Sequence, residues 1–318
     1  MQPSLQPKSR ALLGRIGDVD LRLLRVFKAV ADCGGMAAAE LELDIAMSTI
    51  SRHVKDLEER LGLVLCRRGR AGFALTPEGE KLYAAAGQLL AATESFRGSL
   101  HDIHQRMGGD LHVAVFEKTA SNPEARIAEA VARLRGEAPQ LTLHLHVGTI
   151  AMIERGVMDG QFQLGVVPEH RRSESLVYDD LFGETMRLYA GKGHPWFRAH
   201  RQPFDWADLR RQQLAALGYH SPNLMLAHAR HLEREASASD QEGVATLVLS
   251  GTYVGFLPDH YAEPFVRAGR LRAVAEQTLN YRCRFSCVHR REPAPSRAAQ
   301  AFREALLQAH GGTAGAGA

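Results

Sequence analysis

The fold of the first part of the chain is decided by the stretch STISRHVKDLEERLG, residues 48–62. Its apolar residues recur at spacings of three and four, as they do along one face of an α-helix. Ser51, Arg52 and Lys55 fall on the opposite surface, where they meet solvent or a polar partner. The glycine that ends the stretch is a typical helix terminator. We therefore expect an amphipathic helix, Ser48–Leu61, with a basic outer face.

Two shorter helices precede this one. Apolar residues recur at helical spacing over residues 18–31, and the pair Gly34-Gly35 ends that pattern. The alanine-rich segment 37–43 predicts a second helix, and residues 44–47 are a tight connection. Three short helices in a row are therefore expected.

A small hairpin is expected at residues 63–75, directly after the third helix. Its tip carries Arg67, Arg68 and Arg70. Taken alone, such a cluster is better explained by a solvated surface than by a phosphate contact.

A long helix is predicted from Pro77 to about Met107, because no proline interrupts it and apolar residues follow a heptad seam. Such a stripe must be buried, and a second copy of the chain is the simplest partner. The alternative is that the helix packs on the chain's own following domain. The residues predicted to mediate dimerisation are Leu82, Leu89, Phe96, Leu100 and Ile103.

The length and composition suit a modular globular protein. The chain has 318 residues, enough for two or three domains, and it is 45% hydrophobic and 24% charged. It has no apolar run near the roughly 20 residues of a membrane span, and residues 1–17 lack a signal-peptide core. No CxxC pair occurs among Cys33, Cys66, Cys283 and Cys287. We expect a cytoplasmic protein with no membrane partner.

From position 109 onward, strands alternate with helices. Strands are expected at 111–115, 141–147 and 164–167, one helix is opened by Asn122-Pro123-Glu124, and another follows Gly148-Thr149. This βαβαβ order predicts a parallel sheet.

A second α/β lobe is expected after Pro168. Its predicted strands are 186–190, 214–217 and 252–257, and its helix 241–250 is capped by Asp240. The last strand, 282–289, and the last helix, 296–310, return to the first lobe. Pro168 and residues 279–281 are the candidate crossings between lobes.

The predicted domains follow from these elements. They are a flexible segment 1–17, a first domain 18–77, a linker helix 78–108, a two-lobed domain 109–310 and a disordered tail 311–318. The first lobe comprises about 109–168 and 280–310, and the second about 169–279.

Several motifs resemble those of the LysR-type transcriptional regulators. They are LRLLRVFKAVA at 21–31, STISR at 48–52, LEERLG at 57–62 and LTPEG at 75–79, with the looser GQFQLGV at 160–166 and VGFLP at 254–258. The resemblance implies an α/β protein overall, with an N-terminal winged helix-turn-helix, a long linker helix and a two-lobed, periplasmic-binding-protein-like effector domain. It further implies a homodimer, usually a homotetramer, that binds a double-stranded DNA operator and a small-molecule effector, with RNA polymerase as a further partner.

The family's DNA contacts can be carried over to this sequence by position. Physically, a helix in the major groove reads base edges while flanking cations hold phosphates. Two departures bear on the bases that are read: the family often has glutamine at the position of Met47, and its small-residue pair is here Ala39-Glu40. The predicted DNA-binding residues are Met47, Ser48, Ser51, Arg52, Lys55, Arg67, Arg68 and Arg70.

The predicted effector site lies beyond the carboxyl ends of the strands, where helix N-termini present free N–H groups. Hydroxyls, amides and one lysine there suit a small carboxylate or another anionic metabolite. Ser121, Asn122 and Thr149 are each equally well explained as helix caps. The predicted effector-binding residues are Lys118, Thr119, Ser121, Asn122, Thr149, Pro168, Tyr219, His220 and Ser221.

Other functions are less well supported by the sequence. We predict no metal or cofactor, because His144 and His146 alternate with apolar residues on the polar face of their strand and two ligands do not make a zinc site. Thiol-based redox sensing is an alternative, but Cys283 and Cys287 lie about 13 Å apart in an extended strand, too far for a disulfide. The sequence contains none of the GxSxG, Walker, GxGxxG or HExxH motifs that would indicate an enzyme. An exported solute-binding protein would have no DNA-binding head.

Overall fold

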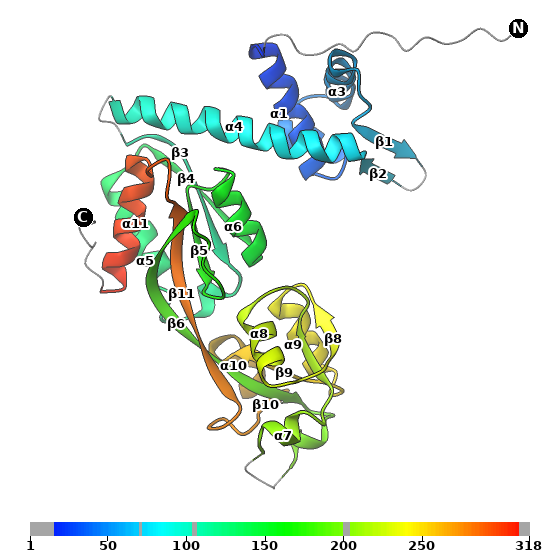
Figure 1. Cartoon of the computed structure of the whole chain (residues 1–318), viewed down its shortest axis with the longest axis vertical. Helices are drawn as coiled ribbons and strands as arrows, with labels where there is room; N and C mark the ends of the chain where they lie inside the picture. Colours follow the sequence, from blue (N-terminus) through cyan, green and yellow to red (C-terminus); the bar gives the residue numbers. More distant parts are fainter. Residues whose placement is uncertain (1–15, 70–71, 104–106, 200–203, 312–318) are drawn as a thin grey trace, which may run out of the picture. The chain divides into compact units, whose positions relative to one another are not determined.

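The computed structural model describes residues 16–69, 72–103, 107–199 and 204–311, which belong to two compact units divided after Phe96. Among the helices of these residues, none combines the length and the apolar character needed to cross a membrane. The two units are described separately below, with the labels of Figure 1.

The first unit consists of three helices, a two-stranded hairpin and the start of a long helix. Their bounds are α1 (Asp18–Asp32), α2 (Met36–Leu43), α3 (Met47–Leu61), β1 (Cys66–Gly69), β2 (Gly72–Leu75) and α4 (Pro77–Ile103). The strands β1 and β2 pair antiparallel. This order confirms the three predicted helices, the hairpin and the linker helix.

The core of the first unit is made by the apolar faces of α1 and α3. Phe27, Ile50, Val54 and Leu57 are each fully buried, as the helical spacing predicted. At about 25 cal/mol per Å² of apolar surface, each such side chain contributes roughly 1.5–3 kcal/mol to folding. Burying this face of α3 leaves the opposite face outward.

The start of α4 packs on the first unit itself. Leu82 and Leu89 are partly buried and contact the core cluster around Leu24 and Phe27, so part of the predicted seam is covered within one chain. Phe96, further along, is 65% exposed. The side chains of Leu100 and Ile103 lie outside the described residues.

The second unit is built on a nine-stranded sheet with strand order β4-β3-β5-β11-β6-β9-β7-β8, with β10 paired to β6. The bounds of the strands are β3 (Gly109–Phe116), β4 (Leu141–Gly148), β5 (Leu164–Pro168), β6 (Leu176–Gly191), β7 (Leu214–Leu217), β8 (Arg234–Ala238), β9 (Val254–Pro258), β10 (Leu271–Ala273) and β11 (Asn280–Arg290). β3 pairs parallel with β4 and with β5, which confirms the predicted parallel βαβαβ unit.

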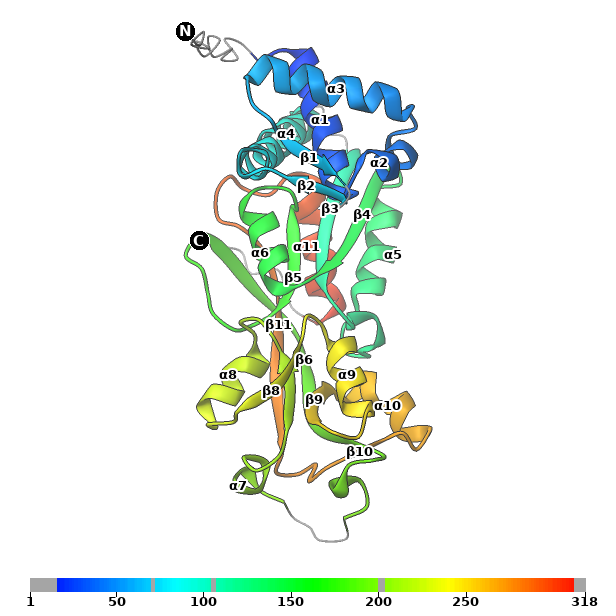
Figure 2. The ribbon, with the colours of Figure 1, turned by 90° about the vertical axis from the view of Figure 1, so that its right-hand side faces the viewer.

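Helices cover this sheet in both lobes (Figure 2). The α-helices are α5 (Ile127–Glu137), α6 (Ile150–Met158), α7 (Trp206–Leu209), α8 (Pro222–Ala229), α9 (Gln241–Leu249), α10 (Asp259–Arg267) and α11 (Arg297–Ala309), and the short 3-10 helices are η1 (Thr119–Ser121) and η2 (Pro195–Phe197). α11 packs against α5, so the end of the chain returns to the first lobe as predicted.

The two lobes are joined by β6 and β11, which run side by side through both of them (Figure 1). Near the start of β6, Tyr178 pairs with Val288 of β11, and β11 pairs in turn with β5. Near its end, Leu188 pairs with Phe256 of β9. The prediction of Pro168 as a crossing is wrong, because this residue ends β5 in register with Phe285 of the first lobe. The crossing runs through the middle of two long strands, so residues 176–182 belong to the first lobe.

The helix that was expected to open at Asn122 begins instead at Ile127. The Asn122 side chain makes other bonds: its Oδ1 accepts from Glu124 N at 2.9 Å, and its Nδ2 donates to Gly183 O at 3.3 Å. These contacts hold the segment against β6, so the helix is delayed by one turn.

The expected apolar face of β4 is covered only in the first half of the strand. Leu141 is buried and Leu143 packs against the core, whereas Leu145 and Val147 are 49% and 62% exposed. The rings of His144 and His146 are instead partly buried and stack on His112 of β3, with centroids 4.4 and 5.5 Å away.

Candidate functional site

The outer face of α3 carries the predicted base-reading and phosphate-binding side chains. Met47, Ser48, Arg52 and Lys55 are exposed and Ser51 is half-buried. The Arg52 Nε lies 3.9 Å from Asp56, and the Lys55 Nζ lies 3.5 Å from Glu59, in pairs whose cations are 79% and 73% exposed. Exposed pairs of this kind are weak, so both cations remain available to a duplex.

The N-terminus of α3 is capped by a residue of α2. Ala46 precedes α3 and offers no side-chain cap, but the Glu40 Oε1 accepts from Met47 N at 3.2 Å. Glu40 is one of the family departures seen in the sequence. Its carboxylate supports the start of α3, where negative charge also favours the helix dipole.

The hairpin of β1 and β2 is the wing, and hydrogen bonds between side chains and backbone hold it against α3 and α4. The Glu58 Oε1 accepts from Leu65 N at 2.7 Å. The Thr76 hydroxyl donates to Val64 O at 2.7 Å and accepts from Gly79 N at 2.9 Å.

These bonds fix where β1 leaves α3. Arg67 in β1 is exposed, as a phosphate contact requires. The side chain of Arg68 and all of Arg70 lie outside the described residues.

In the second unit, the predicted effector residues lie after the ends of β3, β4 and β7 or, for Pro168, at the end of β5. Thr149 and Ser221 each cap a helix, accepting from Met152 N and Leu224 N at 3.3 Å. Ser221 is fully buried, so it serves the fold. The ring of His220 lies 5.1 Å from that of His170. Because His170 lies 3.8 Å from Glu154 of α6 in the first lobe, this ring contact is itself one of the contacts that bridge the lobes.

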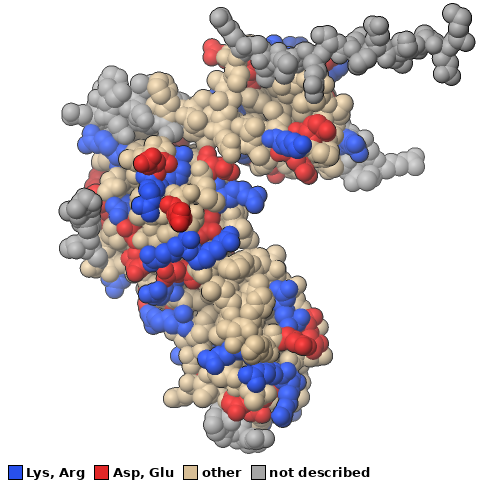
Figure 3. Space-filling view, in the orientation of Figure 1, with Lys and Arg blue, Asp and Glu red and all other residues tan. Residues whose placement is uncertain are grey.

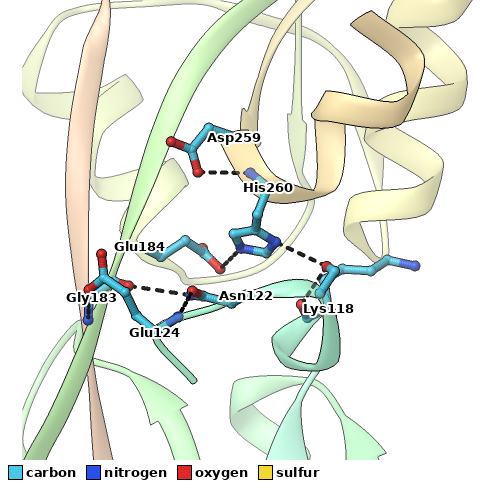
Figure 4. A network of polar contacts seen from close by, with 8 residues as sticks. Lys118, Asn122, Glu124, Gly183, Glu184, Asp259 and His260 are labelled. Carbon is cyan, nitrogen blue, oxygen red and sulfur yellow. Dashed lines mark hydrogen bonds and ion pairs between the residues drawn. The ribbon is translucent and has the colours of Figure 1, made fainter. Parts of the chain in front are cut away.

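Those contacts centre on His260, the second residue of α10 (Figure 4). Its Nε2 lies 3.0 Å from Glu184 of β6, and its Nδ1 lies 3.0 Å from the Ser121 hydroxyl of the first lobe. Burial raises the pKa of Glu184, while the hydrogen bond from His260 lowers it. The prediction named Ser121 but missed Glu184 and His260, which no motif marked.

A second bridge joins Lys118 and Glu117 to the start of α9. The Lys118 Nζ lies 3.2 Å from the Glu242 carboxylate and 4.7 Å from the centre of the Tyr261 ring. The Glu117 Oε1 accepts from Gln241 N at 2.8 Å. Burial raises the pKa of Glu117 from 4.5 to about 7, so its carboxyl is partly protonated near neutral pH.

Two buried polar atoms near this bridge lack a hydrogen-bond partner among the described residues. They are the hydroxyl of Tyr219 and the Oε1 of Gln241. Burial raises the pKa of Tyr219, and the charges of Glu117 and Asp240 raise it further, so its hydroxyl lies beside the bridge. Buried polar groups usually have a partner, so these two atoms are left unsatisfied beside the bridge.

The cysteines of the second unit are poorly suited to redox sensing. Cys283 and Cys287 are buried and unpaired. Burial raises the pKa of Cys287 to about 12 and also raises that of Cys283. The thiolate is the reactive form, so both remain inert thiols at neutral pH.

The fold thus combines a winged helix-turn-helix, whose α3 presents a polar face, with a two-lobed ligand-binding unit. This pairing defines a ligand-responsive DNA-binding protein. Residues 21–80 match the bacterial regulatory helix-turn-helix protein, lysR family, and residues 104–311 match the LysR substrate binding domain. The chain belongs to the LysR family of transcriptional regulators, and it is a DNA-binding regulator with an effector-binding domain.

Individual relatives agree with this assignment. The chain is 39% identical over 294 residues to the HTH-type transcriptional activator BauR of Pseudomonas aeruginosa, covering 92% of this chain and 96% of BauR. It is 27% identical over 204 residues to the probable HTH-type transcriptional regulator LrrA of Synechococcus elongatus, covering 63% of this chain and 66% of LrrA. The fold is similar to that of full-length CbnR, crystallised with its target DNA, with a TM-score of 0.60, 22% identity and coverage of 91% and 99% of the two chains.

Proposed function

We propose that this regulator binds its operator through the outer face of α3 and the wing, and that a small effector bound between the two lobes changes its activity. The observation that carries the proposal is the set of polar contacts that joins the lobes around Lys118 and His260. A ligand that enters there exchanges contacts with both lobes at once.

The proposed DNA contacts divide into two kinds. Met47, Ser48 and Ser51 lie at the start of α3, where a helix in the major groove meets base edges. The cations of α3 and the wing bind phosphates, and each neutralised phosphate adds about 0.9 to the salt slope of binding.

The DNA proposal is tested by neutralising Arg52, Lys55 and Arg67 together with glutamine. Binding to an operator duplex is measured over a range of salt concentrations, with Lys192→Gln, an exposed cation of the second unit, as the control. We expect the slope of log K against log salt to fall by about 3 in the triple variant and to stay unchanged in the control. An unaltered slope in a folded triple variant would overturn the proposal.

For the effector, we propose a small anion that replaces Glu242 beside the Lys118 ammonium. The protonated form of Glu117 supports this, because a neutral carboxyl can donate a hydrogen bond to a carboxylate. Charge-assisted bonds of this kind are about twice as strong as neutral ones.

The effector proposal is tested with benzoate, succinate and glutarate as probes on the full chain. Glu242→Gln should raise the affinity for the acid that binds, because it removes a competitor, and Lys118→Met should abolish the binding. Glu235→Gln, an exposed carboxylate on β8, is the control. Binding that is indifferent to both Lys118 and Glu242 would refute the site.

We also propose assembly into homodimers and homotetramers in the cytoplasm, with RNA polymerase as a partner and no catalytic role. Two separate apolar surfaces support two kinds of contact between copies. One is the exposed part of α4 around Phe96, and the other is the edge strand β4 with Leu145 and Val147. An unpaired strand edge with exposed apolar residues favours pairing with another chain.

A further inference from the structure

An open pocket of about 420 Å³ lies on the second lobe, beside α10 and the paired strands β6 and β10. It is separate from the contacts of Lys118 and Glu117, although His260 and Pro123 are among its lining residues. A pocket of this size falls within the range of small-molecule sites. The residues that decide its chemistry are Arg187, Tyr189, Asp259, Glu263, Val266 and Glu276.

Tyr189 contributes a hydroxyl group to the lining of this pocket. The residue is only 3% exposed, yet its hydroxyl has no hydrogen-bond partner among the described residues. Burial raises the pKa of Tyr189, and the charges that act on it belong to pocket residues, with Arg187 and Asp259 foremost. Its hydroxyl therefore faces the charged groups that line the cavity.

The charges of the pocket are unbalanced towards the negative. Arg187 Nη1 donates to Glu276 at 2.5 Å, and its Nη2 lies 3.7 Å from Asp259. Its single positive charge is thus shared by two carboxylates. Glu263 adds a third carboxylate, whose pair with Arg267 at 3.0 Å is largely exposed and hence weak.

An anion would have to displace carboxylates from Arg187, whereas a cation finds them already in place. Figure 3 shows that positive and negative side chains are interleaved over one face of this unit. The pocket itself is lined by three carboxylates and one arginine, which give it a local excess of negative charge. Val266, which is 38% exposed, adds apolar surface beside it.

We propose that this pocket binds a small aliphatic amine in its protonated form. The ammonium donates to the Tyr189 hydroxyl and to the carboxylates of Glu263 and Asp259. The hydrocarbon part lies against Val266 and Ala273. Ammonium-to-oxygen bonds of this kind supply both affinity and orientation.

The bound amine would lie next to the contacts between the lobes. The Asp259 Oδ1 accepts from the backbone N–H of His260 at 2.7 Å. His260 in turn joins Glu184 to Ser121 across the lobes. The amine site is nevertheless independent of the proposed anionic effector, because it uses neither Lys118 nor Glu117.

The test is calorimetric titration of the full chain with butylamine and 1,4-diaminobutane at neutral pH and constant ionic strength. Butyrate and butanol are the matched ligand controls. We expect saturable binding of an amine at one site per chain and none of the controls. Tyr189→Phe should weaken it about tenfold or more, because it removes a hydrogen bond to a charged group. Glu263→Gln should also weaken it, and Glu235→Gln should not.

Three outcomes would overturn the proposal. They are the absence of saturable amine binding, binding of butyrate as tight as that of butylamine, and amine affinities unchanged in both Tyr189→Phe and Glu263→Gln. Thermal unfolding of each variant establishes that it is folded. If Tyr189→Phe fails to fold, the exposed Glu263→Gln decides, since no core contact depends on it.

Discussion

Replacing Glu117 with glutamine should stabilise the protein above neutral pH and have little effect in acid. The carboxyl lies at the bridge between the lobes, where its Oε1 accepts from Gln241 N at 2.8 Å. Glutamine keeps that acceptor and removes the charge. The substitution therefore isolates what ionisation of a partly buried carboxyl costs the fold.

The sign and size follow from the pKa of Glu117, which burial raises from 4.5 to about 7. The unfolded chain loses this proton near pH 4.5 and the folded chain only near pH 7, so stability falls as pH rises through that window. A pKa shift of this size corresponds to roughly 3 kcal/mol of folding stability. Since the group is partly exposed, solvent screening reduces it to about 1–2 kcal/mol.

Thermal unfolding of the full chain at about pH 5 and pH 8 measures the effect. For a unit of this size, 1–2 kcal/mol corresponds to roughly 2–8 °C in Tm. Glu117→Gln should raise the Tm of the second unit by that amount at pH 8 and much less at pH 5. Glu235→Gln, an exposed carboxylate, should show no such pH dependence. A Glu117→Gln variant that is less stable than the parent at pH 8 would refute the reasoning.

Two further predictions concern the first unit. Asp20 is 2% exposed at its side chain and lies 2.7 Å from Arg60. Asp20→Asn should therefore cost about 2 kcal/mol in chemical unfolding, because it leaves the charge of Arg60 without its partner. Asp56→Asn, at an exposed pair, should cost little, and equal effects of the two substitutions would contradict the assignment. In Gly79→Ala the new Cβ would lie 2.0 Å from the backbone oxygen of Leu65, so the wing must move and unfolding should become easier by about 3 kcal/mol; an unchanged Tm would show that the approach is not tight.

The parts of the fold that periodicity describes were predicted well. The helical spacing of α3 and the alternation of short strands with helices depend on local sequence, and both are confirmed. α10 was missed because Pro264 lies inside it, and proline normally argues against a helix. β8 was missed because its sequence REASA has little strand propensity, and it forms by parallel pairing with β7.

The second half of β4 was misjudged for a related reason. An alternating strand has two faces, and sequence alone does not say which one the rest of the fold covers. Here the cover ends within the strand, so Leu141 is buried while Val147, on the same face, is exposed. The three stacked histidine rings were likewise unpredictable, since His112 lies in a neighbouring strand.

The effector region was only half predictable. Residues that follow strand ends were correctly placed at the edge of the sheet, because parallel strands align their carboxyl ends. Their partners come from elements far along the chain: Glu184 from the crossing of β6, His260 from α10 and Gln241 from α9. No local pattern brings those together; the long antiparallel pair β6–β11 does so by carrying both lobes.

That construction limits how an effector can act. The lobes already share the Lys118–Glu242 and Ser121–His260–Glu184 contacts, so a ligand between them must replace bonds as well as form them. It shifts the lobes towards another arrangement only by the difference in free energy between the bonds it forms and the bonds it replaces. A ligand that also bonds the Tyr219 hydroxyl and the Gln241 oxygen, which lack a hydrogen-bond partner among the described residues, adds bonds there without having to replace any.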